Sequence, residues 1–447
     1  MKTIALISSG NYHRIWYPVI EELTKHNINV EIYCMNFKAY NYFENVLPGT
    51  AKYLYKDVNT FYRNMTRKDE EWLFNSLMVD KNHYKKTSGQ YQVRIGSVFA
   101  KVINEWLLQS KANCFFFPII ESIQCDIFYS LLVKSGRRSF VHTHLRHLNR
   151  SFWSSDKFES LPQGFEDIKP SDQSIYRAQT FIDKFRNDPT GLSYEKQIGS
   201  LTAEGVYTEV YEEPIPLLRL IRNAKLSFTW ERHNRLYSPI TKFKVYIQRI
   251  LVPLNRAVYG IFEKYYLQPL KVLPDVFAYF PLQFSPESSI NTPNPEYIDQ
   301  IKCVEEILFR TPYYRPLIIK EHPAMFLKRN WSFYNRLKKM PYVFFVSKNY
   351  SSIELLSKAD CTFTVTGTVS MEAYLLDKMI EMLGSNFLKI PIEQNMNKLD
   401  FFSRIYQLSE PFYLYSPPPK NLNDNRYLAL FKESNIKAIA LSVANLC

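Results

Sequence analysis

Short apolar runs alternate with amphipathic stretches over the first 150 residues. The run KTIALIS at 2–8 is rich in β-forming residues, and an amphipathic stretch leads from it into a second apolar run. This order predicts a strand, a crossover helix and a parallel strand. The elements expected in this part of the chain are 2–8, 16–25, 30–34, 96–110, 114–120 and 124–134. The pattern is therefore that of one α/β domain.

A second alternation of the same kind begins at Val276. The expected strands are 276–282, 315–320, 342–346, 361–366 and 379–383, and a helix is expected after each of the first four. Asn294 and Pro295 are residue types that favour a helix cap and a first helical position, so the first of these helices is expected to begin there. Five strands alternating with helices predict a second doubly wound sheet.

Three further segments complete the expected organisation. Residues 151–215 are polar and without a clean period, which is typical of an insertion or a helical excursion. Residues 219–271 carry eleven basic and two acidic residues, a net charge of +9, with apolar residues at helical spacing. The expected domain boundaries are 1–218, 219–271, 272–400 and 401–447. The predicted fold class is α/β, with two doubly wound Rossmann-like domains, a helical insertion and a C-terminal helix.

Composition narrows the class of protein. Of 447 residues, 46% are hydrophobic and 22% charged, as in globular proteins. The net charge of +13 favours anionic partners such as nucleotides, nucleic acid, an anionic membrane face or an acidic polymer. Six scattered cysteines form no CxxC pair, so reduced and mostly buried thiols are expected. No run of 18 apolar residues occurs, and the N-terminal apolar run is too short for a signal peptide, so a cytoplasmic protein is expected.

Two common phosphate-binding motifs are missing from the sequence. No GxGxxG follows either opening strand, and GxxxxGK[ST] does not occur. The dinucleotide and P-loop hypotheses therefore lose their usual phosphate cradles. Two α/β domains joined by a basic helical connection remain a natural housing for a nucleotide-sugar transferase.

The motif KEHP ends the expected strand 315–320 of the second domain. Open α/β sheets bind ligands at the carboxyl ends of their strands. Lys320 and His322 are suited to meet a phosphate there, and Pro323 would fix the turn that aims the imidazole. The alternative is an ordinary surface histidine.

The segment TGTVSME at 366–372 ends another strand and opens a helix. Gly367, Thr368 and Ser370 offer small hydroxyls and backbone N–H groups at the positive end of a helix, which favours an anion. Glu372 lies in the first turn, where a carboxylate is suited to hold ribose hydroxyls. The alternative is an ordinary capping pattern.

Three segments in this order carry a resemblance to a known family: PLQFSPESS at 281–289, IIKEHP at 318–323 and TGTVSMEAYLLDKMIEM at 366–382. Together they look like the capsule polysaccharide biosynthesis family of bacterial transferases. That family resembles the Kdo transferases that use CMP-Kdo and, more distantly, the bacterial sialyltransferases. The resemblance implies a GT-B fold, in which two Rossmann-like domains face a cleft and the C-terminal domain binds most of the CMP.

The resemblance also implies roles for individual residues. His322 and Pro323 match the His-Pro motif of these transferases, Thr368 and Ser370 occupy the small-hydroxyl motif, and Glu372 matches the acidic position. One residue separates the two hydroxyl residues, where the related enzymes have an adjacent Ser-Ser pair. The acceptor is not implied, because the N-terminal half matches weakly.

A catalytic carboxylate is expected in the first domain. Glu121 directly follows the apolar run 114–120, and Asp126 lies about a turn later. A transferase needs a carboxylate that takes the acceptor proton or stabilises an oxocarbenium ion. Glu121 is the first candidate, and helix capping is the alternative.

A basic cluster follows the expected helix 124–134, and the alternation of His142 and His144 suits a strand end. Its members are His142, His144, Arg146, His147 and Arg150. It has the residue types for a metal, an acidic acceptor or a structural face. No carboxylate accompanies it, so a metal is not expected.

The leading hypothesis is a metal-independent glycosyltransferase. It would move Kdo or a nonulosonic acid from its CMP donor to a capsule or lipopolysaccharide acceptor, free or lipid-linked. His322 would contact the CMP phosphate, and Glu121 would act from the acceptor-side domain, 1–218. No cofactor besides the donor is expected.

Two alternatives remain open. One is a CDP-glycerol-type polymer transferase or a sugar-nucleotide epimerase on the same architecture. The other is a basic scaffold that binds membrane or nucleic acid. Under the leading hypothesis nucleic acid is not a partner, and segment 219–271 holds the enzyme against the anionic inner membrane face; alternatively, that segment packs between the domains with solvated charges.

Overall fold

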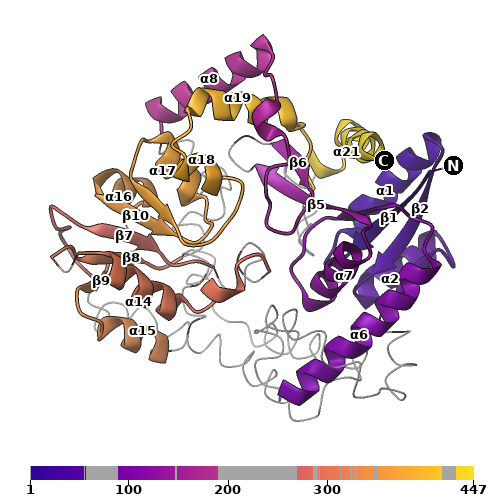
Figure 1. The fold of residues 1–447 in the computed structure, drawn as a ribbon, viewed down its shortest axis with the longest axis horizontal. Coiled ribbons are helices and arrows are strands. Elements are labelled where there is room, and N and C mark those ends of the chain that lie inside the picture. Colours follow the sequence, from indigo (N-terminus) through magenta and orange to yellow (C-terminus); the bar gives the residue numbers. More distant parts are fainter. Residues whose placement is uncertain are drawn as a thin grey trace, which may run out of the picture. The chain divides into compact units, whose positions relative to one another are not determined.

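The computed structural model describes the chain in two compact units. The described residues are 2–54, 56, 89–145, 148, 150–189, 269–284, 290, 292–312, 314–322, 325, 329, 331–346, 350–414 and 429–447. The first unit consists of Met1–Ser174 and Arg404–Cys447, and the second of Ile175–Ser403. Each unit is described by itself (Figure 1).

The first unit is built on a six-stranded sheet in the order β3-β2-β1-β4-β5-β6. All pairs are parallel except β5 with β6. The strands are β1 (Lys2–Ser8), β2 (Ile28–Cys34), β3 (Ala51–Tyr53), β4 (Cys114–Phe117), β5 (Arg138–Leu145) and β6 (Arg150–Ser154). The helices are α1 (His13–Lys25), α2 (Phe37–Val46), α6 (Gly89–Gln109), α7 (Ile123–Lys134), the short 3₁₀ helix η4 (Phe165–Asp167) and α21 (Glu433–Leu446). The predicted α/β domain is confirmed.

Helices pack on both faces of this sheet. Ile4 and Leu6 belong to one apolar cluster with the buried faces of α1 and α21. These two helices contact each other, so the C-terminal helix completes the core of the first unit (Figure 1). On the opposite face, Tyr33 packs against Trp106 of α6 and Phe128 of α7. The sheet is therefore covered by helices on both faces.

The second unit is built on a five-stranded parallel sheet in the order β11-β10-β7-β8-β9. The strands are β7 (Ala278–Pro281), β8 (Leu317–Lys320), β9 (Val343–Phe345), β10 (Cys361–Thr364) and β11 (Ile380–Met382). The helices are η6 (Pro295–Tyr297), α14 (Gln300–Arg310), α15 (Trp331–Lys338), α16 (Ser352–Lys358), α17 (Val369–Leu375) and α18 (Lys389–Glu393). Helices α8 (Asp172–Asn187) and α19 (Lys398–Leu408) contain the points where the chain passes between units.

Helices cover both faces of this second sheet as well. One apolar cluster joins alternate residues of β7 and β8 to α14 and α15, and another joins the remaining residues to α16 and α17 (Figure 1). The second doubly wound sheet is thus confirmed, and with it the predicted α/β class with two Rossmann-like domains. That their sheets face a cleft stays a prediction.

Several boundaries differ from those expected. The helix expected at Pro295 is a 3₁₀ turn, and α14 begins at Gln300 because the side chain of Asp299 caps it, accepting from the Ile301 N–H. The polar stretch after residue 150 opens with an antiparallel strand, β6. Most of segment 401–447 belongs to the first unit instead of standing apart, and most of α8 belongs to the second.

Part of the expected organisation lies outside the described residues. Of segment 219–271, all but the last three residues fall there, so its expected role at a membrane stays a prediction. None of the described helices is long and apolar enough to cross a membrane. Five of the six cysteines are buried and all six are free, as predicted.

Candidate active site

The strand order of the second sheet fixes where a ligand is expected. The chain runs from β7 outward to β8 and β9, then returns to the other side of β7 to form β10 and β11. The order therefore reverses between β7 and β10, and doubly wound sheets bind ligands in the crevice at the carboxyl ends next to this point. The motifs KEHP and TGTVSME follow β8 and β10 at this edge.

A buried carboxylate organises the loop after β8. Glu321 is 5% exposed, and its Oε2 accepts from Arg329 Nε and from the Tyr334 hydroxyl, each at 2.8 Å. Its Oε1 accepts from the backbone N–H of His322 at 2.7 Å. A buried charge requires such partners, because losing water costs several kcal/mol. Glu321 thus fixes the backbone that presents His322.

The same arginine connects this loop to the end of β7. Arg329 Nη2 donates to the carbonyl oxygen of Gln283 at 2.5 Å. The Gln283 side chain in turn donates from Nε2 to Thr364 Oγ1 at 3.4 Å, and Thr364 Oγ1 accepts from the Gly367 N–H at 3.3 Å. The ends of β7, β8 and β10 are therefore joined by one chain of polar contacts.

The turn between β10 and α17 is compact. A Cβ atom at Gly367 would lie 3.1 Å from Gln283 Oε1 and 3.3 Å from Thr364 Oγ1, so a larger residue would crowd both. Ser370 is fully buried, and its Oγ donates to the Gly367 carbonyl at 2.7 Å. Its N–H donates to the same oxygen at 2.9 Å. In this arrangement Ser370 holds the turn, and a direct contact with a ligand stays a prediction.

The remaining predicted residues of this site differ in exposure. Lys320 is 5% exposed and donates from Nζ to Ser352 Oγ at 3.1 Å, on the face of the sheet covered by α16. Glu372 is 3% exposed. His322 is half-buried beside Phe284, with ring centroids 5.7 Å apart, and Gly367 and Thr368 are also half-buried. A ligand can reach the last three most directly.

Pro323 lies outside the described residues, as do 285–289 of the first motif. The turn that Pro323 was expected to fix is therefore not described. Met325, farther along, donates its N–H to the His322 carbonyl at 2.8 Å.

The two carboxylates considered in the first unit have different surroundings. Glu121 is exposed and precedes Ser122, whose hydroxyl caps α7 by accepting from the Cys125 N–H. Helix capping is thus performed by Ser122. Asp126 is 1% exposed and pairs with Lys157 Nζ at 2.7 Å, a geometry that favours a structural role. The catalytic role of Glu121 stays a prediction.

The described members of the basic cluster lie in β5 and β6 and are largely structural. His142 is buried with Nε2 2.9 Å from Ser151 Oγ, and burial lowers the pKa of His142 to about 3. Arg150 is buried and donates from Nε to Ser409 Oγ at 2.8 Å, which binds β6 to the C-terminal segment. His144 packs beside Tyr413. Arg146 and His147 lie outside the described residues.

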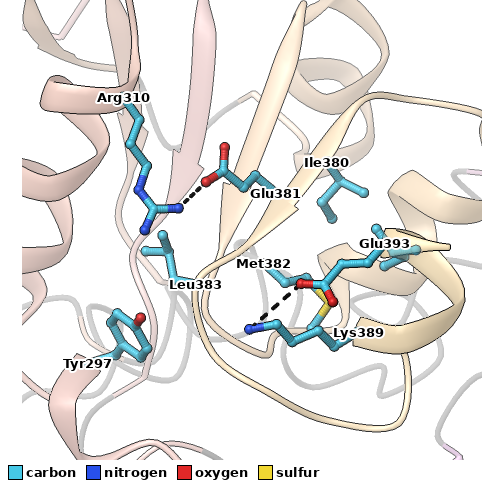
Figure 2. A pocket seen from close by; sticks show the side chains of 9 residues that line it. Tyr297, Arg310, Ile380, Glu381, Met382, Leu383, Lys389 and Glu393 are labelled. Carbon is cyan, nitrogen blue, oxygen red and sulfur yellow. Dashed lines mark hydrogen bonds and ion pairs between the residues drawn. The ribbon is translucent and has the colours of Figure 1, made fainter. Parts of the chain in front are cut away.

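A separate hollow of about 300 Å³ lies along β11, which is the edge strand of the second sheet (Figure 2). Its charged lining residues pair with one another: Arg310 with Glu381, and Lys389 with Glu393 at 3.9 Å. These side chains come from α14, β11 and α18 (Figure 2). The pairs satisfy their own charges, so the hollow offers a ligand little electrostatic attraction.

Among the residues that the structure describes, no group of three or more His, Cys, Asp or Glu side chains is arranged to hold a metal ion. Metal independence stays a prediction of the sequence.

Sequence reasoning missed Gln283, Arg329 and Tyr334. All three have partners outside their own strand or helix, such as Gln283, which Arg329 contacts across 46 residues. The acidic residue inside KEHP was the one available signal, since a buried glutamate implies a cation nearby.

The fold and these strand-end loops define an α/β protein of two doubly wound sheets, with a candidate ligand site at a topological switch point. Residues 260–394 match the family model described as capsule polysaccharide biosynthesis protein, and this stretch contains all three motifs. The resemblance inferred from those motifs is confirmed for this part of the chain.

The other comparisons give distant likenesses. None of the curated proteins matches the chain significantly. Among solved structures, the β-Kdo 2,7 transferase KpsC of Thermosulfurimonas dismutans is 11% identical with a TM-score of 0.38, covering 93% of this chain and 98% of that one. The UDP-GlcNAc 2-epimerase of Methanocaldococcus jannaschii is 14% identical with a TM-score of 0.27, covering all of both chains. TM-scores this low do not support any inference about this chain, and the fold is assigned from the strand order of its two sheets.

Proposed function

We propose that this protein is a glycosyltransferase that moves a 2-keto-3-deoxy sugar acid, Kdo or a nonulosonic acid, from its CMP donor to a bacterial capsule or lipopolysaccharide glycan. The observation that supports it most is where the family match falls. It spans the three motifs, and two of these follow β8 and β10 beside the switch point of the second sheet. The acceptor, the need for CMP and metal independence are parts of the proposal.

The candidate site residues of the second unit have two proposed roles: some would contact the donor, and others would hold the loops that carry those contacts. His322, Gly367 and Thr368 are half-buried and would meet the CMP phosphate. Ser370, Glu321 and the other buried groups would keep the two loops in place. Such a shell preorganises the contact groups before the ligand arrives, which lowers the cost of binding.

The proposed catalytic contribution is electrostatic. As the bond from sugar to phosphate breaks, negative charge grows on the departing CMP. A hydrogen-bond donor aimed at that phosphate stabilises the transition state more than the ground state. His322 is the proposed donor, and two contacts support this choice: Glu321 holds its backbone N–H, and Phe284 flanks its ring.

The first experiment is titration calorimetry of CMP into the wild-type chain and His322→Ala, with turnover and thermal melts measured in parallel. Removing one such donor typically costs about 3 to 4 kcal/mol of barrier, so turnover should fall by roughly two to three orders of magnitude. The melting temperature should change little because the ring is half-buried. The control His26→Ala removes an exposed histidine of the first unit and should leave both values unchanged.

The ligand series distinguishes the alternatives. Stabilisation by CMP over UDP, CDP-glycerol and single-stranded nucleic acid is expected, since a ligand raises stability only by binding the folded state. Preference for UDP or CDP-glycerol would support the epimerase or the polymer transferase instead. Unchanged CMP affinity and activity in a well-folded His322→Ala would remove the assignment of this site.

A further inference from the structure

The first sheet has its own switch point, between β1 and β4. The turn at the carboxyl end of β1 leads through Gly10 into α1. Helix α1 begins without a side-chain cap and has no acidic residue in its first turn, and α2, which starts nearby, also lacks one. Helix N-termini favour anions, so both helix starts leave a positive potential that no acidic side chain of their own first turns offsets.

Buried polar atoms beside this turn have no hydrogen-bond partner. Ser8 is fully buried and His13 is 1% exposed, and Ser8 Oγ and His13 Nδ1 both lack a partner. An unsatisfied buried polar atom costs about 1 to 3 kcal/mol. Native structures therefore rarely leave one without a reason, and a ligand is one such reason.

The histidine ring is surrounded by positive charge. Burial, followed by the charges of Lys38 and Arg14, lowers the pKa of His13 to about 4, so the ring is neutral near pH 7. The backbone of Gly10 acts in the opposite direction and raises this pKa. A neutral imidazole has one nitrogen without a proton, which accepts a hydrogen bond, and the unpartnered Nδ1 is available for this role.

The rim of the turn is accessible. Gly10 and Lys38 are exposed and Asn11 and Arg14 are half-buried, and Lys38 Nζ donates to Asn11 Oδ1 at 2.7 Å. Burial, followed by the charge of Arg14, lowers the pKa of Lys38. Basic groups therefore lie around an acceptor atom. A ligand that pairs with the basic groups and also donates a hydrogen bond to the acceptor nitrogen carries an anionic group and a hydroxyl.

We propose that the turn between β1 and α1 binds the acceptor of the proposed transfer through an anionic group held by Arg14, Lys38 and the start of α1, while an acceptor hydroxyl donates to His13 Nδ1. The acceptor is then an acidic sugar, with a carboxylate or a phosphate. This inference rests on the proposed function for calling the ligand an acceptor, but the site itself lies in the unit that does not carry the CMP motifs.

The test is titration calorimetry of the full chain with glucuronate, glucose 6-phosphate, inorganic phosphate and glucose. Glucuronate and glucose 6-phosphate carry both required groups, so at least one should bind more tightly than inorganic phosphate, and glucose should not bind. Binding by glucuronate alone identifies a carboxylate, and binding by the phosphate ester alone identifies a phosphate.

Two variants and a control assign the site. His13→Phe keeps the ring packed against Tyr42 and removes Nδ1, so the advantage of the sugar over inorganic phosphate should shrink by about fivefold. Lys38→Gln changes an exposed residue that can be replaced without disturbing the fold, and should weaken every anion by a similar factor. Lys25→Gln, at the opposite end of α1 and 68% exposed, should change nothing.

The outcomes separate this inference from the proposed function. Failure of all anions to bind, or equal affinities in Lys38→Gln and wild type, would overturn the subsite even if CMP binds. Anion binding that depends on Lys38 and His13 in a chain that does not bind CMP would keep the subsite and remove the transferase.

Discussion

Replacing Arg329 by methionine tests the polar network beneath the candidate active site. Arg329 and Glu321 are 7% and 3% exposed at their side chains, and Nε lies 2.8 Å from Oε2. Removing one partner of a buried ion pair leaves the other charge uncompensated, which costs about 3 to 5 kcal/mol. Arg329→Met also removes the donor to the Gln283 carbonyl, so the upper half of that range is expected.

The assay is urea unfolding followed by both circular dichroism and tryptophan fluorescence, so that a transition of one unit is recognised. The matched control is Arg336→Met. Arg336 pairs with Glu305 at 3.4 Å, but their side chains are 58% and 46% exposed, so a change within about 0.5 kcal/mol is expected. The control separates loss of an arginine from loss of a buried pair.

The double variant Glu321→Gln/Arg329→Met gives the sharper result. Glutamine removes the stranded charge and still accepts from the His322 N–H, so the double variant should be more stable than Arg329→Met by about 1 to 3 kcal/mol. If Arg329→Met costs no more than Arg336→Met, the pair is not buried and the supporting role assigned to it is wrong.

Three further predictions concern other parts of the chain. Glu121→Gln should lower turnover by at least about a hundredfold with CMP affinity unchanged, and near-normal turnover would place the acceptor base elsewhere. Gly384→Ala should cost about 1 to 3 kcal/mol in urea unfolding, because its Cβ would lie 2.7 Å from Asn294 Oδ1; a neutral effect would mean that this loop moves freely. The pKa of His142 is about 3 when folded and 6.5 in the reference state, so the proton binds on unfolding and stability is lost as the pH falls below 6.5. Between pH 6.5 and 4.5 this loss is about 2 to 3 kcal/mol, and an equally steep pH profile in His142→Phe would show that other groups cause it.

Sequence patterns predicted the strands and helices of the two sheets well where burial alone decides them. The run at 2–8 is β1 to the residue, and the run at 114–120 contains β4 because four consecutive residues there are buried. Such runs need no knowledge of partners, since a central parallel strand is apolar on both faces.

The same reasoning failed where a polar side chain has a distant partner. Asn294 was expected to cap a helix, but its side chain accepts from the Ser385 N–H at 2.7 Å and donates to the Ser385 carbonyl. This contact spans 91 residues and joins two strand-end loops. Local preferences for capping cannot show it, because the competing partner is brought close only by the folded sheet.

The candidate site was predictable in part for the same physical reason. KEHP and TGTVSME stand directly after apolar runs, and parallel strands bring their carboxyl ends to one edge, so the two motifs were expected together. Which of their residues face a ligand was not predictable. Lys320 and Glu321 are adjacent and lie on opposite faces of the sheet. Lys320 bonds to Ser352 and Glu321 bonds to Arg329, so both have partners inside the protein.

The two switch points differ in whether their buried polar groups have hydrogen-bond partners, and this difference affects how much of a ligand's affinity comes from satisfying those groups. At the second sheet, Arg329 donates to Glu321 and to the Gln283 carbonyl, and the Gln283 side chain donates to Thr364, so the loops keep their arrangement without a ligand. At the first sheet, Ser8 Oγ and His13 Nδ1 have no partner. A ligand that supplies partners there removes a cost that the free protein bears, in addition to its other contacts. At equal affinity both ligands stabilise the fold equally, but at the first sheet more of the affinity comes from relieving the buried atoms. His13→Phe should therefore make the free protein no less stable even as it weakens the sugar ligand, the reverse of what Arg329→Met does at the second sheet.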